Sequence, residues 1–503
     1  MILGGIWSFL AALTLFPGNV VIVSHWGDAL HLVDILERMS QGQVPHLDFV
    51  TPLGQLAFLP ISGLMALGLP TGLAYLMAQL LLGAFVGAAT LALALPRMSC
   101  GVGLLFAALG MVTALALVHG RPEFSLSVNV HYNRWGWALS FVALLAALVP
   151  PSRQAHWEGV LVGAIMAALA CIKVTFFVIF LPVVVLGFLM TRQVASLIAA
   201  AVTGVGVVIL LTAVWGFDYW AAYASDLLYV AGAERPSAGN GLLSMLGDIR
   251  MILPTGLVAG AAALMAFAGR TRTVILLLVL FLAGALVSDQ NAGHDPLFLA
   301  FVALLMLVWA DGLSRDLRLG LTFLAAGVTL SIGPNLANMV TSPLRAALTD
   351  RSEFVPLVAG NEAHQDVLLL SSAALADQQV YAEGAMAPLD FRDHAMPVCQ
   401  SVLSSAYFAT FATDLAERGL AQGEPIFIAD YLSPLWMFGE HPPLEDGAPW
   451  SYGGLPGIEH ASFVLVPLCP TRVSVYRLIL AELEAFPMRE VVRTDSYLLY
   501  RPD

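Results

Sequence analysis

The sequence has little charge. Only 11% of its 503 residues are charged and 59% are hydrophobic, whereas an ordinary soluble domain carries about 25% charged residues. A water-exposed surface does not tolerate this deficit, so the composition excludes a soluble protein. The mean hydropathy of +0.82 leads to the same conclusion. We therefore expect a mainly helical protein that crosses a membrane several times.

Lysine is almost absent. Lys173 is the only lysine among 22 basic residues, and it interrupts an apolar run. An ammonium group in hydrocarbon is costly unless it pairs with an anion or faces a water-filled cavity. One interpretation is a side chain that extends to a helix end. The other is a cation that pairs with Asp28 or Asp48, or with a ligand phosphate.

Common enzyme and sorting signals are also missing. The sequence contains no G-x-S-x-G, P-loop, C-x-x-C or H-E-x-x-H motif. The N-terminus lacks the basic segment and the small-residue cleavage site of a signal peptide. We therefore expect residues 4–23 to form a retained membrane helix.

The apolar stretches predict about eleven membrane crossings, since a crossing helix needs about 20 apolar residues. The stretch 53–69 is ambiguous, because Pro60, Gly63 and Gly68 interrupt it. If it does not cross, the arginine-bearing turns face the cytoplasm, as the positive-inside rule requires. We therefore expect 53–69 to be re-entrant or surface-lying. The predicted spans are 4–23, 72–95, 100–118, 135–149, 158–171, 174–190, 195–215, 251–268, 273–287, 297–310 and 320–337.

The charge is concentrated near the C-terminus. Residues 338–503 contain 9 arginines and 21 acidic residues, a net charge of −12, whereas residues 1–337 carry a net charge of −1. This predicts a membrane domain at 1–339, with an outer loop at 24–71, and an acidic extracytoplasmic domain at 340–503. Such acidity argues against binding nucleic acid or an anionic membrane surface.

The C-terminal region has an α/β pattern. Strand-like runs cover 366–370, 425–429, 462–468, 489–493 and 497–501, and helix-like runs cover 402–419 and 472–485. The turn 494–496 predicts a hairpin of the last two strands. Two interpretations of Cys399 and Cys469 remain open, a disulfide in an oxidising compartment and two unpaired buried thiols.

The loop after the first span concentrates polar residues. Asp28, His31, Asp34 and Arg38 repeat at spacings of three or four, which places them on one face of a helix. Such a helix can lie at the membrane surface. Asp28 is interpreted either as an N-cap on a solvated face or as a catalytic carboxylate, and the two roles are compatible. Asp48 either stabilises a turn or supplies a second catalytic carboxylate.

Two later loops are also rich in polar residues. The loop 119–134 contains Arg121, His131, Tyr132 and Arg134, which suit a phosphate and a sugar, although its aromatic residues also suit interfacial anchoring. The loop 288–296 contains His294 and Asp295. Its spacing matches no metal-binding motif, so we expect no metal cofactor.

Two segments carry a family resemblance. The run from His25-Trp26-Gly27-Asp28 to Pro52-Leu53-Gly54 resembles the first outer loop of GT-C glycosyltransferases. More specifically, it looks like the large bacterial group related to protein mannosyltransferases and the aminoarabinose transferase of lipid A. The segment 163–182, with Lys173 and a closing Leu181-Pro182, is similar to a second segment of that group. The sequence departs from it at Gly27, where the group has an acid.

The resemblance implies a GT-C fold and a reaction. The enzyme would transfer a sugar from a polyprenyl-phosphate donor to a hydroxyl group of a glycan, lipid or protein. The transfer would take place at the outer face of a bacterial inner membrane. Asp28 or Asp48 would act as general base, and Lys173 with Arg121 or Arg134 would stabilise the departing phosphate. A lipid-linked sugar flippase and an inactive relative are the alternatives. The residues expected to contact substrate are His25, His31, His131, Tyr132, His294 and Asp295.

Overall fold

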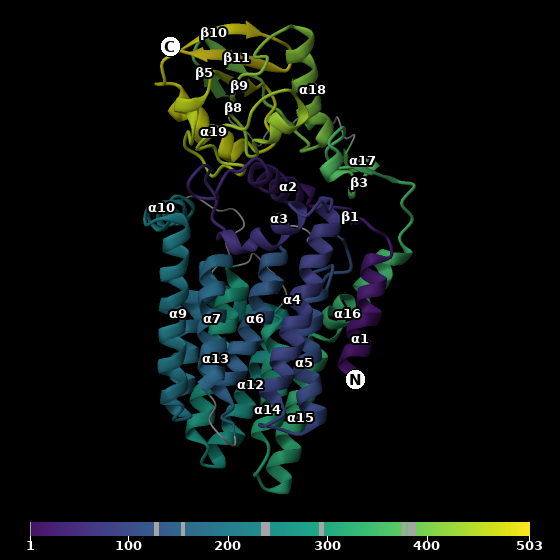
Figure 1. Ribbon diagram of the computed structural model, residues 1–503, viewed down its shortest axis with the longest axis vertical. Coiled ribbons are helices and arrows are strands. Elements are labelled where there is room, and N and C mark those ends of the chain that lie inside the picture. Colours follow the sequence, from purple (N-terminus) through teal and green to yellow (C-terminus); the bar gives the residue numbers. More distant parts are fainter. Residues whose placement is uncertain are drawn as a thin grey trace.

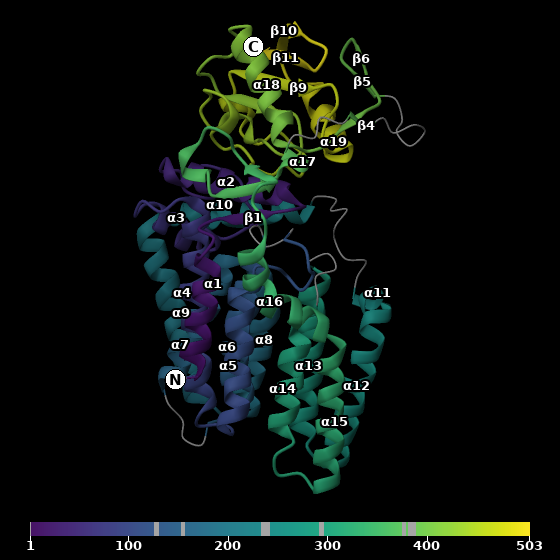
Figure 2. The same cartoon turned by 90° about the vertical axis from the view of Figure 1, so that its right-hand side faces the viewer.

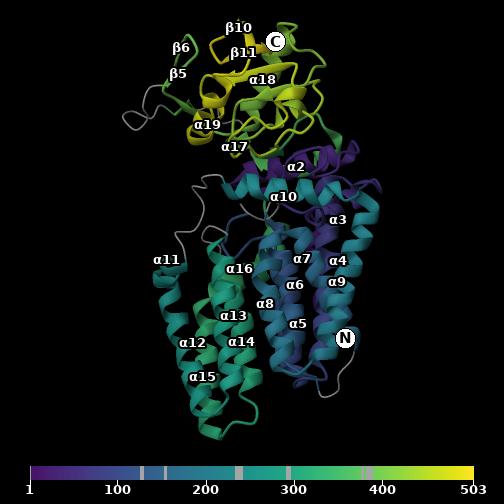
Figure 3. The same cartoon turned by 90° about the vertical axis from the view of Figure 1, so that its left-hand side faces the viewer.

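The computed structural model describes residues 2–124, 130–151, 156–232, 242–290, 296–374, 379–380 and 389–503. Long helices form a bundle at one end of the molecule, and the C-terminal strands lie at the other end (Figure 1). Three helices lie between these two parts in all views (Figures 1, 2 and 3). They are α2 (Trp26–Ser40), α3 (Leu59–Met65) and α10 (Asp218–Gly232).

A helix occupies every predicted span. By length and composition, four of the described helices can each cross a membrane alone, namely α4, α9, α12 and α13. Several others are apolar but shorter. The eleven helices are α1 (Ile2–Leu15), α4 (Thr71–Ala94), α5 (Cys100–Leu115), α6 (His131–Leu148), α7 (His156–Ile172), α8 (Val174–Met190), α9 (Val194–Trp215), α12 (Ile249–Phe267), α13 (Thr271–Asp289), α14 (Phe298–Trp309) and α15 (Arg315–Ser331).

The ends of the membrane region differ from the prediction. Helix α1 stops at Leu15, and β1 (Val20–Ile22) pairs in parallel with β3 (Val367–Leu370). The span 4–23 was therefore predicted too long. At the other end, α15 meets α16 (Gly333–Leu348) at a bend of 58°, and the predicted domain boundary falls within α16.

The ambiguous stretch 53–69 contains only short helices. Residues Gln55–Ala57 form a 3₁₀ helix, and α3 has seven residues. Seven residues of α-helix extend about 10 Å, whereas the hydrocarbon core is about 30 Å thick. The helices of this stretch are therefore too short to cross.

The C-terminal part is α/β, as predicted. Its four-stranded sheet has the order β10-β11-β9-β8. Strands β8 (Ile426–Ile428) and β9 (Phe463–Pro467) are parallel, and β10 (Met488–Arg493) and β11 (Tyr497–Pro502) form the predicted antiparallel hairpin. Helices α18 (Ser405–Glu417) and α19 (Val473–Leu483) accompany the sheet. Of the two open interpretations, the structure has the Cys399–Cys469 disulfide.

The C-terminal part rests on the polar face of α2. Arg38 donates from Nε to Asp34 Oδ1 at 2.7 Å and from Nη1 to the Leu444 carbonyl oxygen at 2.9 Å. Trp436 Nε1 donates to the same Asp34 oxygen at 3.2 Å. Asp34 and Arg38 are fully buried. The interpretation of this face as solvated is therefore wrong, because residues far along the chain cover it.

Candidate functional site

Lys173 lies in the break between two membrane helices. Helix α7 ends at Ile172 and α8 begins at Val174, with Lys173 extended between them (φ −154°, ψ 107°). Its Nζ donates to Asn133 Oδ1 at 2.9 Å and lies 5.2 Å from the centre of the Tyr132 ring. The ammonium group is thus held at the start of α6, among polar side chains.

The first loop packs directly against this break. The Gly54 amide donates to the Ile172 carbonyl oxygen at 3.1 Å. A Cβ atom on Gly54 would lie 2.2 Å from the Cys171 carbonyl oxygen, so only glycine allows this approach. The two segments that carry the family resemblance therefore meet in space, with Lys173 next to the contact.

Asp28 lies in the first turn of α2. The residue before the helix is His25, which is exposed and has a left-handed backbone (φ 52°). Asp28 is therefore the third helical residue and not the N-cap. A carboxylate in the first turn is stabilised by the helix dipole. Asp28 also interacts electrostatically with Tyr132, whose ring lies beside Lys173, so Asp28 faces the same region as Lys173.

The C-terminal domain forms the opposite wall of this site. Burial raises the pKa of Tyr431, Arg472 lowers it, and the charge of Asp28 raises it further. The Trp450 ring lies 4.4 Å from Tyr431 and 5.3 Å from His31. Sequence reasoning missed this wall, because nothing in the C-terminal region indicates that it faces residue 28.

Gly27 allows the wall to approach. A Cβ atom at Gly27 would lie 2.5 Å from Leu403 Cδ2 and 3.4 Å from Leu432 Cδ1. A side chain at this position would require the Leu403 side chain to shift. Glycine at this position therefore lets Leu403 pack directly against the start of α2.

An apolar cavity leads to the same place. It has a volume of about 380 Å³ and lies between the first loop and helices α4, α6 and α7. Ile172, the residue before Lys173, lines the cavity. Trp135, one helical turn after Tyr132, lines it as well. Leu81 and Phe85 also line it and are 57% and 44% exposed. The cavity thus extends from the apolar surface of the bundle to Ile172, the residue before Lys173.

Asp48 holds its own turn. Its Oδ2 accepts from the Val44 amide at 2.6 Å. Asp226 of α10 supports the same loop, because its Oδ2 accepts from the Thr51 amide at 3.0 Å and lies 2.7 Å from His46 Nδ1. These contacts favour a structural role for Asp48. Asp226 was missed from the sequence, since its partners are about 180 residues away.

The other predicted site residues are dispersed. Arg134 is fully buried and donates to the Tyr75 hydroxyl at 2.7 Å and to Gln79 Oε1 at 2.8 Å. Arg121 is exposed, and no contact among the described residues joins it to Lys173 or Asp28. His131 Nε2 donates to the Ala57 carbonyl oxygen at 2.7 Å. His294 and Asp295 lie outside the described residues.

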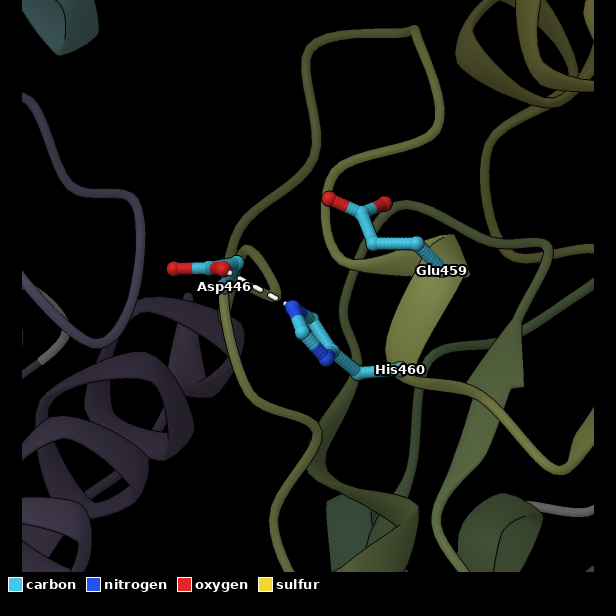
Figure 4. Close-up of side chains that lie close together, drawn as sticks. All are labelled: Asp446, Glu459 and His460. Atoms are coloured by element: carbon cyan, nitrogen blue, oxygen red, sulfur yellow. Dashed lines mark hydrogen bonds and ion pairs between the residues drawn. The ribbon is translucent and has the colours of Figure 1, made fainter.

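A second polar cluster lies on the C-terminal domain. Asp446, Glu459 and His460 each offer a ligand atom within 4.8 Å of the others, the one such group found among the described residues (Figure 4). His460 Nε2 lies 3.0 Å from Asp446 Oδ2, so His460 already has a partner. The Asp446 amide donates to the Asp48 carbonyl oxygen at 2.9 Å, which ties the cluster to the first loop.

No protein-family model matches the chain, and no curated protein matches it either. Solved structures do. ArnT from Cupriavidus metallidurans bound to undecaprenyl phosphate is 12% identical, with 99% of this chain and 96% of that chain covered and a TM-score of 0.45. The arabinofuranosyltransferase AftD from Mycobacteria is 13% identical, with 100% and 39% covered and a TM-score of 0.46.

An oligosaccharyltransferase from Archaeoglobus fulgidus is 11% identical, with 70% of this chain and 56% of that chain covered and a TM-score of 0.39. These neighbours are GT-C glycosyltransferases, the group that the first loop resembles. All three of these TM-scores are below 0.5.

Proposed function

We propose that this protein transfers a sugar from a polyprenyl-phosphate donor to an acceptor hydroxyl at the outer face of a bacterial inner membrane. The observation that supports this proposal is the position of Lys173. The only lysine of the protein directly follows Ile172, which lines an apolar cavity that also reaches the exposed side chains of Leu81 and Phe85. A ligand with an apolar tail and an anionic head has the matching chemistry.

The reaction that these residues support is a direct displacement. Asp28 accepts the proton of the acceptor hydroxyl as general base. The acceptor oxygen then bonds to the anomeric carbon while the bond from that carbon to the phosphate oxygen breaks, which inverts the anomeric centre. The polyprenyl phosphate leaves with both electrons of the broken bond. Lys173 stabilises its charge, which is more localised in the transition state than in the donor.

The test compares two carboxylates. Wild-type protein, Asp28→Asn and Asp48→Asn are assayed for sugar transfer from a panel of polyprenyl-phosphate sugars to envelope lipids. A positioned general base contributes about 10²- to 10⁴-fold to a rate, so we expect Asp28→Asn to lose about that much. Asp48→Asn should retain most of the transfer rate of folded protein, because its carboxylate accepts from its own turn.

The remaining outcomes separate the alternatives. The opposite pattern, with transfer lost only in Asp48→Asn, would assign the role of general base to Asp48. Wild-type protein that binds polyprenyl phosphate but transfers no sugar would indicate a flippase or an inactive relative. Because Lys173 supplies the cation in this proposal, transfer should also persist in the presence of EDTA, whereas a complete loss would assign a metal to the reaction.

A further inference from the structure

Two residues of the C-terminal domain follow neighbouring parallel strands. Tyr431 comes three residues after β8, and Arg472 comes five residues after β9. In α/β proteins, ligands bind outside the carboxyl ends of parallel strands, where neighbouring loops converge. Here that edge of the sheet faces α2, since Asp28 interacts electrostatically with Tyr431.

One buried carboxylate fixes both loops. Asp430 Oδ1 accepts from the Tyr431 amide at 2.7 Å and from Thr471 Oγ1 at 2.8 Å, and Oδ2 accepts from the Thr471 amide at 2.9 Å. The Tyr407 hydroxyl donates to Oδ2 at 2.7 Å. Asp430 is 1% exposed. It therefore positions Tyr431 and Arg472, one on each loop, without reaching the site itself.

The guanidinium group of Arg472 lies against the ring of Tyr431. Its guanidinium carbon lies 4.7 Å from the centre of the Tyr431 ring. Arg472 also acts on the Tyr431 hydroxyl through a side-chain hydrogen bond. Stacking on an aromatic ring fixes a guanidinium group, and a guanidinium has further donors in its plane. Within the described ranges, Arg472 forms no salt bridge with any carboxylate. A half-buried cation beside a proposed catalytic carboxylate is thus without an anionic partner from the described chain.

We propose that Arg472 and Tyr431 form the acceptor subsite and bind an acceptor sugar that carries a phosphate or carboxylate group. In the proposed function, Lys173 and the apolar cavity bind the sugar donor on the membrane side of Asp28. Arg472 lies on the opposite wall of the site, which the C-terminal domain forms. The fork of donors on arginine pairs with either oxyanion, and the Tyr431 ring adds an apolar face for the sugar. This inference rests on the proposed function.

The test measures binding without transfer. Full-length protein in detergent is titrated calorimetrically with glucose 6-phosphate, glucuronate and glucose. A hydrogen-bonded charge pair is expected to favour the anionic sugars over glucose by about tenfold or more in affinity. Comparison of glucose 6-phosphate with glucuronate identifies the preferred oxyanion. Arg472→Gln should abolish the preference, and Arg472→Lys should retain only part of it, because lysine lacks the planar fork.

Arg489→Gln is the matched control, since Arg489 is an exposed arginine on β10 of the same domain. It should bind all three sugars as the wild type does. Equal affinity of wild-type protein for anionic and neutral sugars overturns the inference, as does a preference that survives in folded Arg472→Gln. Because this assay uses no donor, its result is separate from the proposed function, which fails only if wild-type protein transfers no sugar.

Discussion

His31 lies on the face of α2 that the C-terminal domain covers. Its ring is 5.3 Å from that of Trp450, and its Nε2 is buried. Burial lowers the pKa of His31 from 6.5 to about 3, so the ring is neutral at physiological pH. A neutral ring adds no charge to the site and contributes an apolar contact between the two domains.

Acid should therefore destabilise the protein through His31. Between pH 6.5 and about 3, the unfolded chain binds a proton that the folded protein excludes, so stability falls as the pH decreases. At pH 5 this amounts to on the order of 1–2 kcal/mol. Thermal unfolding at pH 7.5 and pH 5.0 measures it. His31→Gln should lose less stability than the wild type over this interval, whereas the exposed His25→Gln should lose as much. Equal losses in all three proteins would contradict this role.

The candidate site could be proposed from the sequence only where its residues are unusual in their own neighbourhood. Lys173 stands out because it is a lone cation in an apolar run, and Asp28 because it follows a membrane span. Tyr431 and Arg472 have no such signal, since a tyrosine and an arginine in an acidic soluble domain are ordinary. Their role depends on contacts across about 400 residues of sequence, which no local pattern encodes.

Among the elements, the contact between the first loop and the α7–α8 break positions Lys173. Gly54 has an ordinary backbone (φ −67°, ψ 154°), so alanine is disfavoured there only by its methyl group, which would meet the Cys171 carbonyl oxygen. Backbone atoms cannot move aside as a flexible side chain can. We expect Gly54→Ala to cost about 1–3 kcal/mol in the free energy of unfolding and to shift Lys173 away from Asn133.

The measurement is the unfolding midpoint together with the transfer rate. Gly54→Ala should lower both. Gly63→Ala is the matched control, because Gly63 lies in α3 of the same loop and a Cβ there meets nothing within 4 Å. Its stability should be unchanged or slightly raised, as expected for alanine in a helix. A Gly54→Ala protein with wild-type stability and rate would show that the loop does not hold the break in place.

The hydrophobic runs of the sequence predicted the positions of the membrane helices, but they did not predict strand β1. The apolar run that begins at residue 4 continues to residue 23, and hydropathy alone does not separate a helix from a buried strand. Pro17 and Gly18 do interrupt the run, and the helix ends two residues before them. The pairing of Val20 with Val367 is a long-range contact. It ties the start of the chain to the C-terminal domain.

At the scale of the whole molecule, the C-terminal domain is joined to one end of the bundle. Asp366 accepts from the amides of Gly72 and Leu73 at 2.9 and 2.7 Å, at the start of α4. Helix α4 has 24 residues and extends about 36 Å away from that point. Its far end leads to Cys100, an exposed free cysteine at the start of α5. Cys100 and the C-terminal domain are therefore at opposite ends of α4, and we expect them on opposite faces of the membrane.

This arrangement makes the predicted orientation testable with one native residue. The positive-inside rule places the turn with Arg97 in the cytoplasm, and hence the C-terminal domain outside. In intact bacterial cells, a membrane-impermeant maleimide should leave Cys100 unlabelled and should label it after permeabilisation. Asp495→Cys, in the exposed turn between β10 and β11, should be labelled in intact cells, with Cys100→Ser as the background for that measurement. Labelling of Cys100 in intact cells, with Asp495→Cys protected, would place the site on the cytoplasmic face and would require a donor sugar presented from inside.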